Sequence, residues 1–376
     1  MKRMTAVVLA AVLLIIPAQG AGGAPQVAAG AAVLMEKETG EVLYESHAHD
    51  KLEPASVTKI MTMLLVMEAV DAGQIALEDM VTVSARAASM GGSQVYLKEG
   101  EQLSVSDMLK AVAVVSGNDA AVALAEHLTG SEERFVEKMN QRARELGMQD
   151  TCFLNCTGLP VAGHLTSAYD IALMSRALIG HPQIRAYTTI WMDSIRDGQF
   201  QLANTNKLIR FYEGATGLKT GHTDSAGYCL SATAERDGME LIAVVLKADS
   251  TDQRFGSAKD LLNYGFATYT LMDVYPSQAL PPVDVLLGVE EQLQPVLSRS
   301  SRILVRKEEL NDVVTDIRLC TDVEAPVENG QRLGEMSVQV GGQEIASIPI
   351  VASCAVERLT VPGIFVQLLH QLFLTP

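Results

Sequence analysis

The chain has 376 residues, of which 48% are hydrophobic and 20% charged, and its formal net charge is −16. This length predicts two or more domains, and the apolar fraction is ample for a buried core. The acidic balance argues against nucleic-acid binding, which needs a basic face, and against adhesion to an anionic membrane through charge alone.

Residues 1–20 have the pattern of a secretory signal peptide. Lys2 and Arg3 form a positive start, an apolar run follows over 7–16, and 18–20 offer small residues where a signal peptidase cuts. Because the run is too short to span a bilayer with ease, we expect a leader that is removed and a protein secreted across the cytoplasmic membrane. An uncleaved N-terminal anchor is the alternative.

Residues 21–275 predict strands at both ends and helices between them. The expected strands are 32–35, 42–44, 228–234 and 241–246, and the expected helices are 59–70, 105–115, 120–128, 132–146, 166–178 and 260–271. A glycine-rich stretch over 87–100 indicates a loop. Strands from the two ends can pair in one antiparallel sheet that helices cover, which predicts an α+β domain.

A change of pattern at Pro276, Pro281 and Pro282 predicts a domain boundary. Short strands are expected at 283–287, 303–305, 313–319, 336–340 and 344–350. They predict a small all-β C-terminal domain over 276–360.

The tail, 361–376, is mostly apolar, and its polar residues Gln367, His370 and Gln371 fall on one side of a helix. Such a helix is about 20 Å long, too short to cross a bilayer. The pattern favours an amphipathic helix on the outer face of the cytoplasmic membrane. Packing of the helix against the β domain is the alternative.

The five cysteines are Cys152, Cys156, Cys229, Cys320 and Cys354. A disulfide-built secreted domain would be smaller and richer in cysteine. We expect buried thiols, with a Cys152–Cys156 bridge as the alternative.

Three short strings indicate an acyl-transferring serine enzyme: Ser56-Val57-Thr58-Lys59, Ser116-Gly117-Asn118 and Lys219-Thr220-Gly221. The first falls at the start of an expected helix and the third just before a β-meander. Each is common by chance, but their order and placement together point to one site.

The chemistry explains the residue types. Ser56 and Lys59 share a helix face, and a serine hydroxyl needs a base to take its proton. A lysine becomes that base when burial and a nearby cation, here Lys219, lower its pKa. The Ser56 N–H at the helix N-terminus and the His222 N–H can form an oxyanion hole.

The remaining motif residues have roles in binding and proton transfer. Ser116 can relay a proton to the leaving amine, and Asn118 can hold both Lys59 and the substrate amide. Thr220 can bind a substrate carboxylate beside Lys219. A side chain at Gly221 would crowd the nucleophile.

The segments 54–62, 116–120 and 217–223 resemble those of D-alanyl-D-alanine carboxypeptidases, the low-molecular-mass penicillin-binding proteins, and the likeness covers nearly the whole chain. A loop with Asn155 and Gly158-Leu159-Pro160 resembles a family loop, which usually has Pro-His where this chain has Cys156-Thr157. That departure leaves the role of the loop open.

The resemblance implies a penicillin-binding/β-lactamase-like fold, a C-terminal β domain and a membrane tail. It implies that Ser56 attacks the carbonyl between two terminal D-alanines of a peptidoglycan stem peptide, that water hydrolyses the acyl-enzyme, and that β-lactam antibiotics acylate Ser56. Arg254 matches the family arginine that holds the terminal carboxylate; a surface arginine is the alternative. No cofactor or metal is implied.

Other functions are less well supported. A class A β-lactamase places a glutamate and an asparagine between the second and third motifs, and no E-x-x-L-N occurs between Asn118 and Lys219. A transpeptidase or endopeptidase would share the same residues. A non-enzymatic wall-binding protein would be expected to have lost a catalytic residue, and none is missing.

Two histidine hypotheses are also weaker. A Ser-His site with His222 is not favoured, since Lys59 fills the base role and no G-x-S-x-G elbow is present. His47 and His49 lack further ligands at metal-binding spacing, so no metal site is expected.

Overall fold

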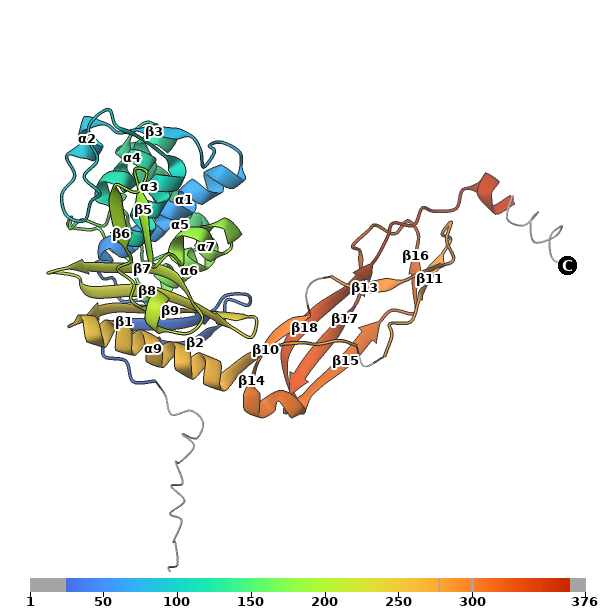
Figure 1. Cartoon of the computed structure of the whole chain (residues 1–376). Coiled ribbons are helices and arrows are strands. Elements are labelled where there is room, and N and C mark those ends of the chain that lie inside the picture. Colours follow the sequence, from blue (N-terminus) through green and yellow to red (C-terminus); the bar gives the residue numbers. More distant parts are fainter. Residues whose placement is uncertain (1–24, 277, 299–300, 366–376) are drawn as a thin grey trace, which may run out of the picture.

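The computed structural model describes residues 25–276, 278–298 and 301–365. The expected leader and most of the tail therefore lie outside the described residues. The chain forms a domain of helices packed on a sheet and an elongated domain of strands, with the last described residues at the far end of the second domain (Figure 1).

A five-stranded antiparallel sheet with the order β2-β1-β9-β8-β7 forms the centre of the first domain. Its strands are β1 (Ala31–Glu36), β2 (Val42–Ser46), β7 (Ala215–Thr223), β8 (Gly227–Arg236) and β9 (Met239–Ala248). The two ends of the domain meet where β1 pairs with β9, from Ala31 opposite Leu246 to Glu36 opposite Leu241. The order leaves β7 at an edge of the sheet.

Helices cover both faces of this sheet (Figure 1). The helical segments are η1 (Ala55–Thr58), α1 (Lys59–Asp71), α2 (Ala85–Ala88), α3 (Val105–Val115), α4 (Asn118–Thr129), α5 (Glu132–Glu145), α6 (Ala168–Ile179), η2 (Pro182–Ile184), α7 (Arg185–Thr188), α8 (Leu208–Phe211) and α9 (Thr251–Thr268). On one face α9 packs Phe255 and Leu262 against Leu241. On the other face α6, with Ile171, packs against β1 and β9, and α1 packs on α6 and contacts β7.

Two short hairpins complete the first domain: β3 (Met80–Thr82) with β4 (Gln102–Ser104), and β5 (Met192–Ile195) with β6 (Phe200–Ala203).

The second domain contains β10 (Tyr269–Asp273), β11 (Val283–Leu286), β12 (Gln292–Leu293), β13 (Pro295–Leu297), β14 (Arg302–Arg306), η3 (Lys307–Asp312), β15 (Val313–Leu319), β16 (Asp322–Glu324), β17 (Arg332–Val340) and β18 (Gln343–Ala352). The largest sheet has the order β13-β18-β17-β15. Met336, Val338 and Ile348 lie in its core. The fold class expected from the sequence, an α+β domain with a helix-covered antiparallel sheet followed by a small β domain, is confirmed.

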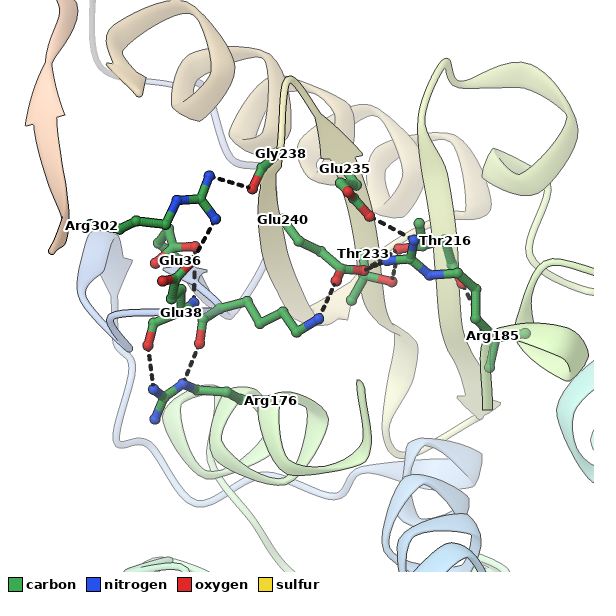
Figure 2. A network of polar contacts seen from close by, with 12 residues as sticks. Glu36, Glu38, Arg176, Arg185, Thr216, Thr233, Glu235, Gly238, Glu240 and Arg302 are labelled. Atoms are coloured by element: carbon green, nitrogen blue, oxygen red, sulfur yellow. Dashed lines mark hydrogen bonds and ion pairs between the residues drawn. The ribbon is translucent and has the colours of Figure 1, made fainter. Parts of the chain in front are cut away.

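Polar contacts join the two domains (Figure 2). Arg302 of β14 donates to the Glu38 carboxylate at 2.9 Å and to the Gly238 carbonyl at 3.5 Å. Arg176 of α6 donates to the carbonyls of Lys37 and Glu38, which fixes the same turn from the other side. The turn between β1 and β2 thus connects the sheet, a covering helix and the β domain.

One expected helix is wrong at both ends. The helix predicted over 260–271 is α9, which begins at Thr251, because the Ser250 side chain accepts from the Gln253 N–H and caps it. It ends at Thr268, and Tyr269 begins β10, which pairs with β14. The loop expected over 87–100 is also partly wrong, since its first residues complete α2.

The five cysteines are free thiols, so the alternative Cys152–Cys156 bridge is absent. The expectation of buried thiols is confirmed for Cys156 and Cys229 but is wrong for the exposed Cys152 and Cys354 and the half-buried Cys320. At the tail, residues 361–365 are helical and the rest lies outside the described residues. Within the described ranges no helix has the length and hydrophobicity needed to cross a membrane.

Candidate active site

Ser56 lies in η1, immediately before α1. Its neighbour Ala55 has a φ of +48°, a left-handed conformation that costs free energy for a residue with a side chain. The backbone therefore turns sharply at this point, and the half-buried Ser56 is placed at the beginning of the helix. The N–H groups of a first helical turn have no partners within the helix, so the turn suits the binding of developing negative charge.

Lys59 is fully buried, and its Nζ contacts three oxygen atoms. These are Ser56 Oγ at 3.0 Å, Asn118 Oδ1 at 2.7 Å and the Thr157 carbonyl at 2.7 Å. Burial lowers the pKa of Lys59 to about 7, although the nearby Cys156 and Asp119 act in the opposite direction. The free amine is therefore substantially populated at neutral pH.

Ser116 ends α3 with a φ of +65° and is 4% exposed. Its Oγ has no hydrogen-bond partner among the described residues. Buried hydroxyls are rarely left unpaired, so each such case needs an explanation. Ser116 is hydrogen-bonded to neither lysine, and its free hydroxyl suits a group that acts when substrate is bound.

Asn118 begins α4 beside Ser116. Its Oδ1 accepts from Lys59, and its Nδ2 donates to the Gly91 carbonyl at 2.7 Å. An amide nitrogen carries two hydrogens, so the second is available to a substrate carbonyl. The structure brings Asn118 and Lys59 together as the sequence predicted.

The edge strand β7 lies directly against the Ser56 segment. A Cβ atom built on Gly221 would lie 3.0 Å from the Ser56 backbone nitrogen and 2.8 Å from the Pro54 carbonyl oxygen. Glycine is therefore required at this approach. Lys219 is fully buried on the same strand, and its Nζ donates to the Thr220 carbonyl at 2.9 Å. Burial, followed by the charges of Lys59 and Arg254, holds the pKa of Lys219 well below its usual range.

Arg254 lies in the first turn of α9 and is 7% exposed. It donates to the carbonyls of Gly221 at 3.2 Å and Cys229 at 3.4 Å, whereas its Nε has no partner among the described residues. Burial lowers its pKa, which Cys229 and Tyr228 partly offset. Arg254 thus lies behind the third motif and is not a surface arginine.

His222 is exposed, and its ring lies 4.2 Å from that of Tyr228. No hydrogen bond joins it to Ser56 in the described part of the chain, so this geometry gives no support to a Ser-His pair.

Three features of the site were missed by sequence reasoning. The first is the Thr157 carbonyl on Lys59. Because Thr157 acts here through its backbone, the departure from Pro-His at 156–157 does not remove the contact. The Asn155 side chain holds this loop by accepting from the N–H groups of Thr157 and Gly158.

The second is Thr205, whose hydroxyl lies 2.7 Å from that of Thr220. Its N–H donates to the Val114 carbonyl at 3.1 Å, so Thr205 bridges the end of α3 and the third motif. No sequence signal distinguishes it from other loop threonines.

The third is the buried His164. Its Nδ1 accepts from the Leu154 N–H at 3.0 Å, so Nε2 carries the hydrogen and donates to Thr58 Oγ1 at 2.8 Å. Burial lowers the pKa of His164 to about 4. The neutral ring connects Leu154, which directly precedes the 155–160 loop, to Thr58 in the first motif.

Comparisons with known proteins agree with this geometry. The family model described as D-alanyl-D-alanine carboxypeptidase matches residues 18–250, and that of the penicillin-binding protein 5 C-terminal domain matches 272–358. The carboxypeptidase DacF of Bacillus subtilis is 44% identical over 329 residues, covering 86% of this chain and 85% of DacF.

Solved structures show the same relationship. Penicillin-binding protein 5 of Haemophilus influenzae matches with a TM-score of 0.81 at 30% identity, covering 90% of this chain and 100% of that one. Penicillin-binding protein D2 of Listeria monocytogenes, solved with ampicillin bound, matches with a TM-score of 0.59 at 35% identity, covering 64% and 98%.

The sheet, the Ser-Lys pair at a helix start and the lysine on the adjoining edge strand are those of a serine-type penicillin-binding hydrolase. Within that class, the chain belongs to the D-alanyl-D-alanine carboxypeptidase family and carries its C-terminal β domain.

Proposed function

We propose that this chain removes the terminal D-alanine from peptidoglycan stem peptides through an acyl-enzyme at Ser56. The observation that carries the proposal is the set of three oxygens around Lys59 Nζ. A neutral amine has two hydrogens and one lone pair. With the hydrogens directed at Asn118 Oδ1 and the Thr157 carbonyl, the lone pair faces Ser56 Oγ–H. Lys59 is then the general base.

Acylation follows from this arrangement. Ser56 Oγ attacks the carbonyl between the two D-alanines while its proton passes to Lys59. The oxyanion accepts from the N–H groups of Ser56 and His222, at the close approach of β7 to the helix start. The C–N bond breaks, Ser116 relays a proton to the departing amine, and free D-alanine leaves. Water then attacks the ester, which restores Ser56 and releases the shortened peptide.

The third motif suits the terminal carboxylate. Thr220 donates a hydrogen bond to it, and Lys219 and Arg254 supply positive charge behind the strand. Since a bound carboxylate favours the charged form of a neighbouring lysine, substrate raises the pKa that burial has lowered in Lys219.

β-Lactam antibiotics present a carboxylate and a reactive carbonyl to the same groups, so we propose that they acylate Ser56. The ampicillin-bound relative supports this part of the proposal. The enzyme would work outside the cytoplasm after removal of residues 1–20. The exposed Val361 and Phe365 at the start of the tail support peripheral binding to the outer face of the cytoplasmic membrane.

The test uses the Ser56→Ala variant. We expect loss of both D-alanine release from a pentapeptide and labelling by a fluorescent penicillin, with the melting temperature unchanged. Mass mapping of the penicillin adduct in the unmodified protein should place it on the peptide that contains Ser56. Normal labelling of the variant would refute the assignment.

A further inference from the structure

A buried carboxylate outside the three motifs lies against the loop that contacts Lys59. Glu132 is in the first turn of α5 and is 8% exposed. Carboxylates are rarely buried unless hydrogen bonds or an opposite charge compensate for the lost water. The chemistry described above gives Glu132 no task, so its burial beside this loop needs another explanation.

The two oxygens of Glu132 have different partners. Oε2 accepts from Arg86 Nη2 at 3.2 Å. Oε1 accepts from the Cys156 N–H at 3.3 Å and from the Cys156 thiol at 3.4 Å. Burial, followed by the nearby Glu132, holds the pKa of this thiol well above its usual range, so the sulfur keeps the hydrogen that it donates. Arg86 thus occupies one oxygen, and the other is directed at the loop.

Cys156 directly precedes the residue whose carbonyl contacts the amine. Its own carbonyl accepts from Thr62 Oγ1 of α1 at 2.7 Å. The next carbonyl along the chain, that of Thr157, accepts from Lys59 Nζ at 2.7 Å. Cys156 is therefore held through its N–H by α5 and through its carbonyl by α1. The Asn155 contacts lie within the loop, so they shape the loop without attaching it to a helix.

We propose that Glu132 is a positioning residue for acylation. By holding Cys156 it keeps the Thr157 carbonyl against the amine of Lys59. A neutral amine that donates to two fixed acceptors has its lone pair directed at the third neighbour, here Ser56 Oγ. If the carbonyl moves away, one hydrogen of the amine loses its acceptor and the lone pair is no longer directed. The inference rests on the proposed function, in which Lys59 is the general base.

Two substitutions separate the hydrogen bonds of Glu132 from its charge. Glu132→Leu removes the acceptor, and we expect the rate of acylation by a fluorescent penicillin to fall about tenfold, the scale of one hydrogen bond. Glu132→Gln keeps an oxygen for the buried Cys156 N–H, while Arg86, which is 61% exposed, can turn to water. It should therefore acylate within about twofold of the unmodified protein.

The pH dependence of acylation gives a readout that a change in folding alone would not move. In the unmodified protein the rate should rise through a midpoint near the Lys59 pKa of about 7. The loss of an acceptor disfavours the charged amine, so this midpoint should move to lower pH in Glu132→Leu. It should stay in place in Glu132→Gln. Stopped-flow labelling across this pH range gives the profiles.

Glu240→Leu is the matched control. Glu240 is 5% exposed and is ion-paired with Lys37 at 2.8 Å and with Arg185 at 3.0 Å (Figure 2). It lies at the end of β9 that is away from the third motif. Both leucine variants lose a buried carboxylate and should melt at a lower temperature, but only Glu132→Leu should acylate slowly.

A rate or a pH midpoint in Glu132→Leu equal to that of the unmodified protein would overturn the inference. An equal loss of rate in Glu132→Gln would also overturn it, because the effect would then come from the charge. So would an equal loss in Glu240→Leu, which would point to general destabilisation. All of these results leave the proposed function standing, whereas failure of penicillin to acylate the unmodified protein would refute the proposed function itself.

Discussion

The hydroxyl oxygens of Thr205 and Thr220 lie 2.7 Å apart, in a contact between a loop and the third motif. A threonine hydroxyl has one hydrogen to donate. For Thr220 to donate to a substrate carboxylate, the hydrogen between the two residues must come from Thr205. Thr205 therefore acts as a positioning residue for Thr220.

We expect Thr205→Val to raise KM for a D-Ala-D-Ala peptide by about fivefold with little change in kcat, the scale of one hydrogen bond. Thr205→Ser keeps the donor and should restore KM. A peptide ending in an amide lacks the negative charge and should be affected less by Thr205→Val. A Thr205→Val enzyme with normal KM would show that the contact does not position Thr220.

The low pKa of Lys59, about 7, predicts a pH dependence for acylation. The base must be uncharged, so the rate of acylation by penicillin should rise as pH increases through about 7 and then level off. Stopped-flow labelling between pH 5.5 and pH 9 gives the profile. A rate that does not vary over this range would exclude Lys59 as the base.

The same shift affects stability. Between pH values of about 7 and 10.5, Lys59 carries a proton in the unfolded chain but not in the folded protein. This group therefore makes the free energy of unfolding rise with pH. Lys59→Met should therefore stabilise the protein more at pH 6 than at pH 9, as measured by urea unfolding at the two pH values.

Gly158 is expected to be irreplaceable. Its φ is +81°, and a Cβ atom there would lie 1.8 Å from the Ala55 carbonyl oxygen. Gly158→Ala should displace the loop, remove the Thr157 contact to Lys59 and reduce penicillin labelling at least a hundredfold.

Gly163→Ala, three residues beyond the 155–160 loop, is the control. Gly163 has a φ of +92°, but its added Cβ would meet only Leu154 Cδ1, at 3.6 Å. This variant should be less stable by about 1–2 kcal/mol, and penicillin should label it as it labels the unmodified protein. Equal labelling of the two variants would argue against a catalytic role for the loop position.

Because His164 is buried as a neutral ring, we expect the free energy of unfolding to fall in acid. Its pKa is about 4 when folded against 6.5 as the ordinary value, so the unfolded chain binds the proton more tightly. The stability from the neutral ring is fully present above pH 6.5 and is lost as pH falls towards 4, by about 3 kcal/mol at 1.4 kcal/mol per pH unit. Urea unfolding at pH 7 and pH 4 should show this loss in the unmodified protein but not in His164→Asn. An equal loss in both would place the acid sensitivity elsewhere.

The sequence was a good guide where the signal was local. The helix predicted over 105–115 is α3, and Ser104, one of two expected caps, does accept from the Asp107 N–H. The sequence-based prediction failed for α9 and β10. The chain passes from helix to strand at Tyr269 without a proline or glycine, and the strand forms there because it pairs with the distant β14.

The residue types and their order were sufficient to determine the family and the proposed chemistry, because Ser56 and Lys59 share one helical turn in any sequence that forms this helix. Tertiary structure alone decided what surrounds the amine. Asn118 and Thr157 reach Lys59 across sequence separations of 59 and 98 residues. The pKa of a buried group depends on such distant partners and on the water that they exclude, and neither is encoded in a local pattern.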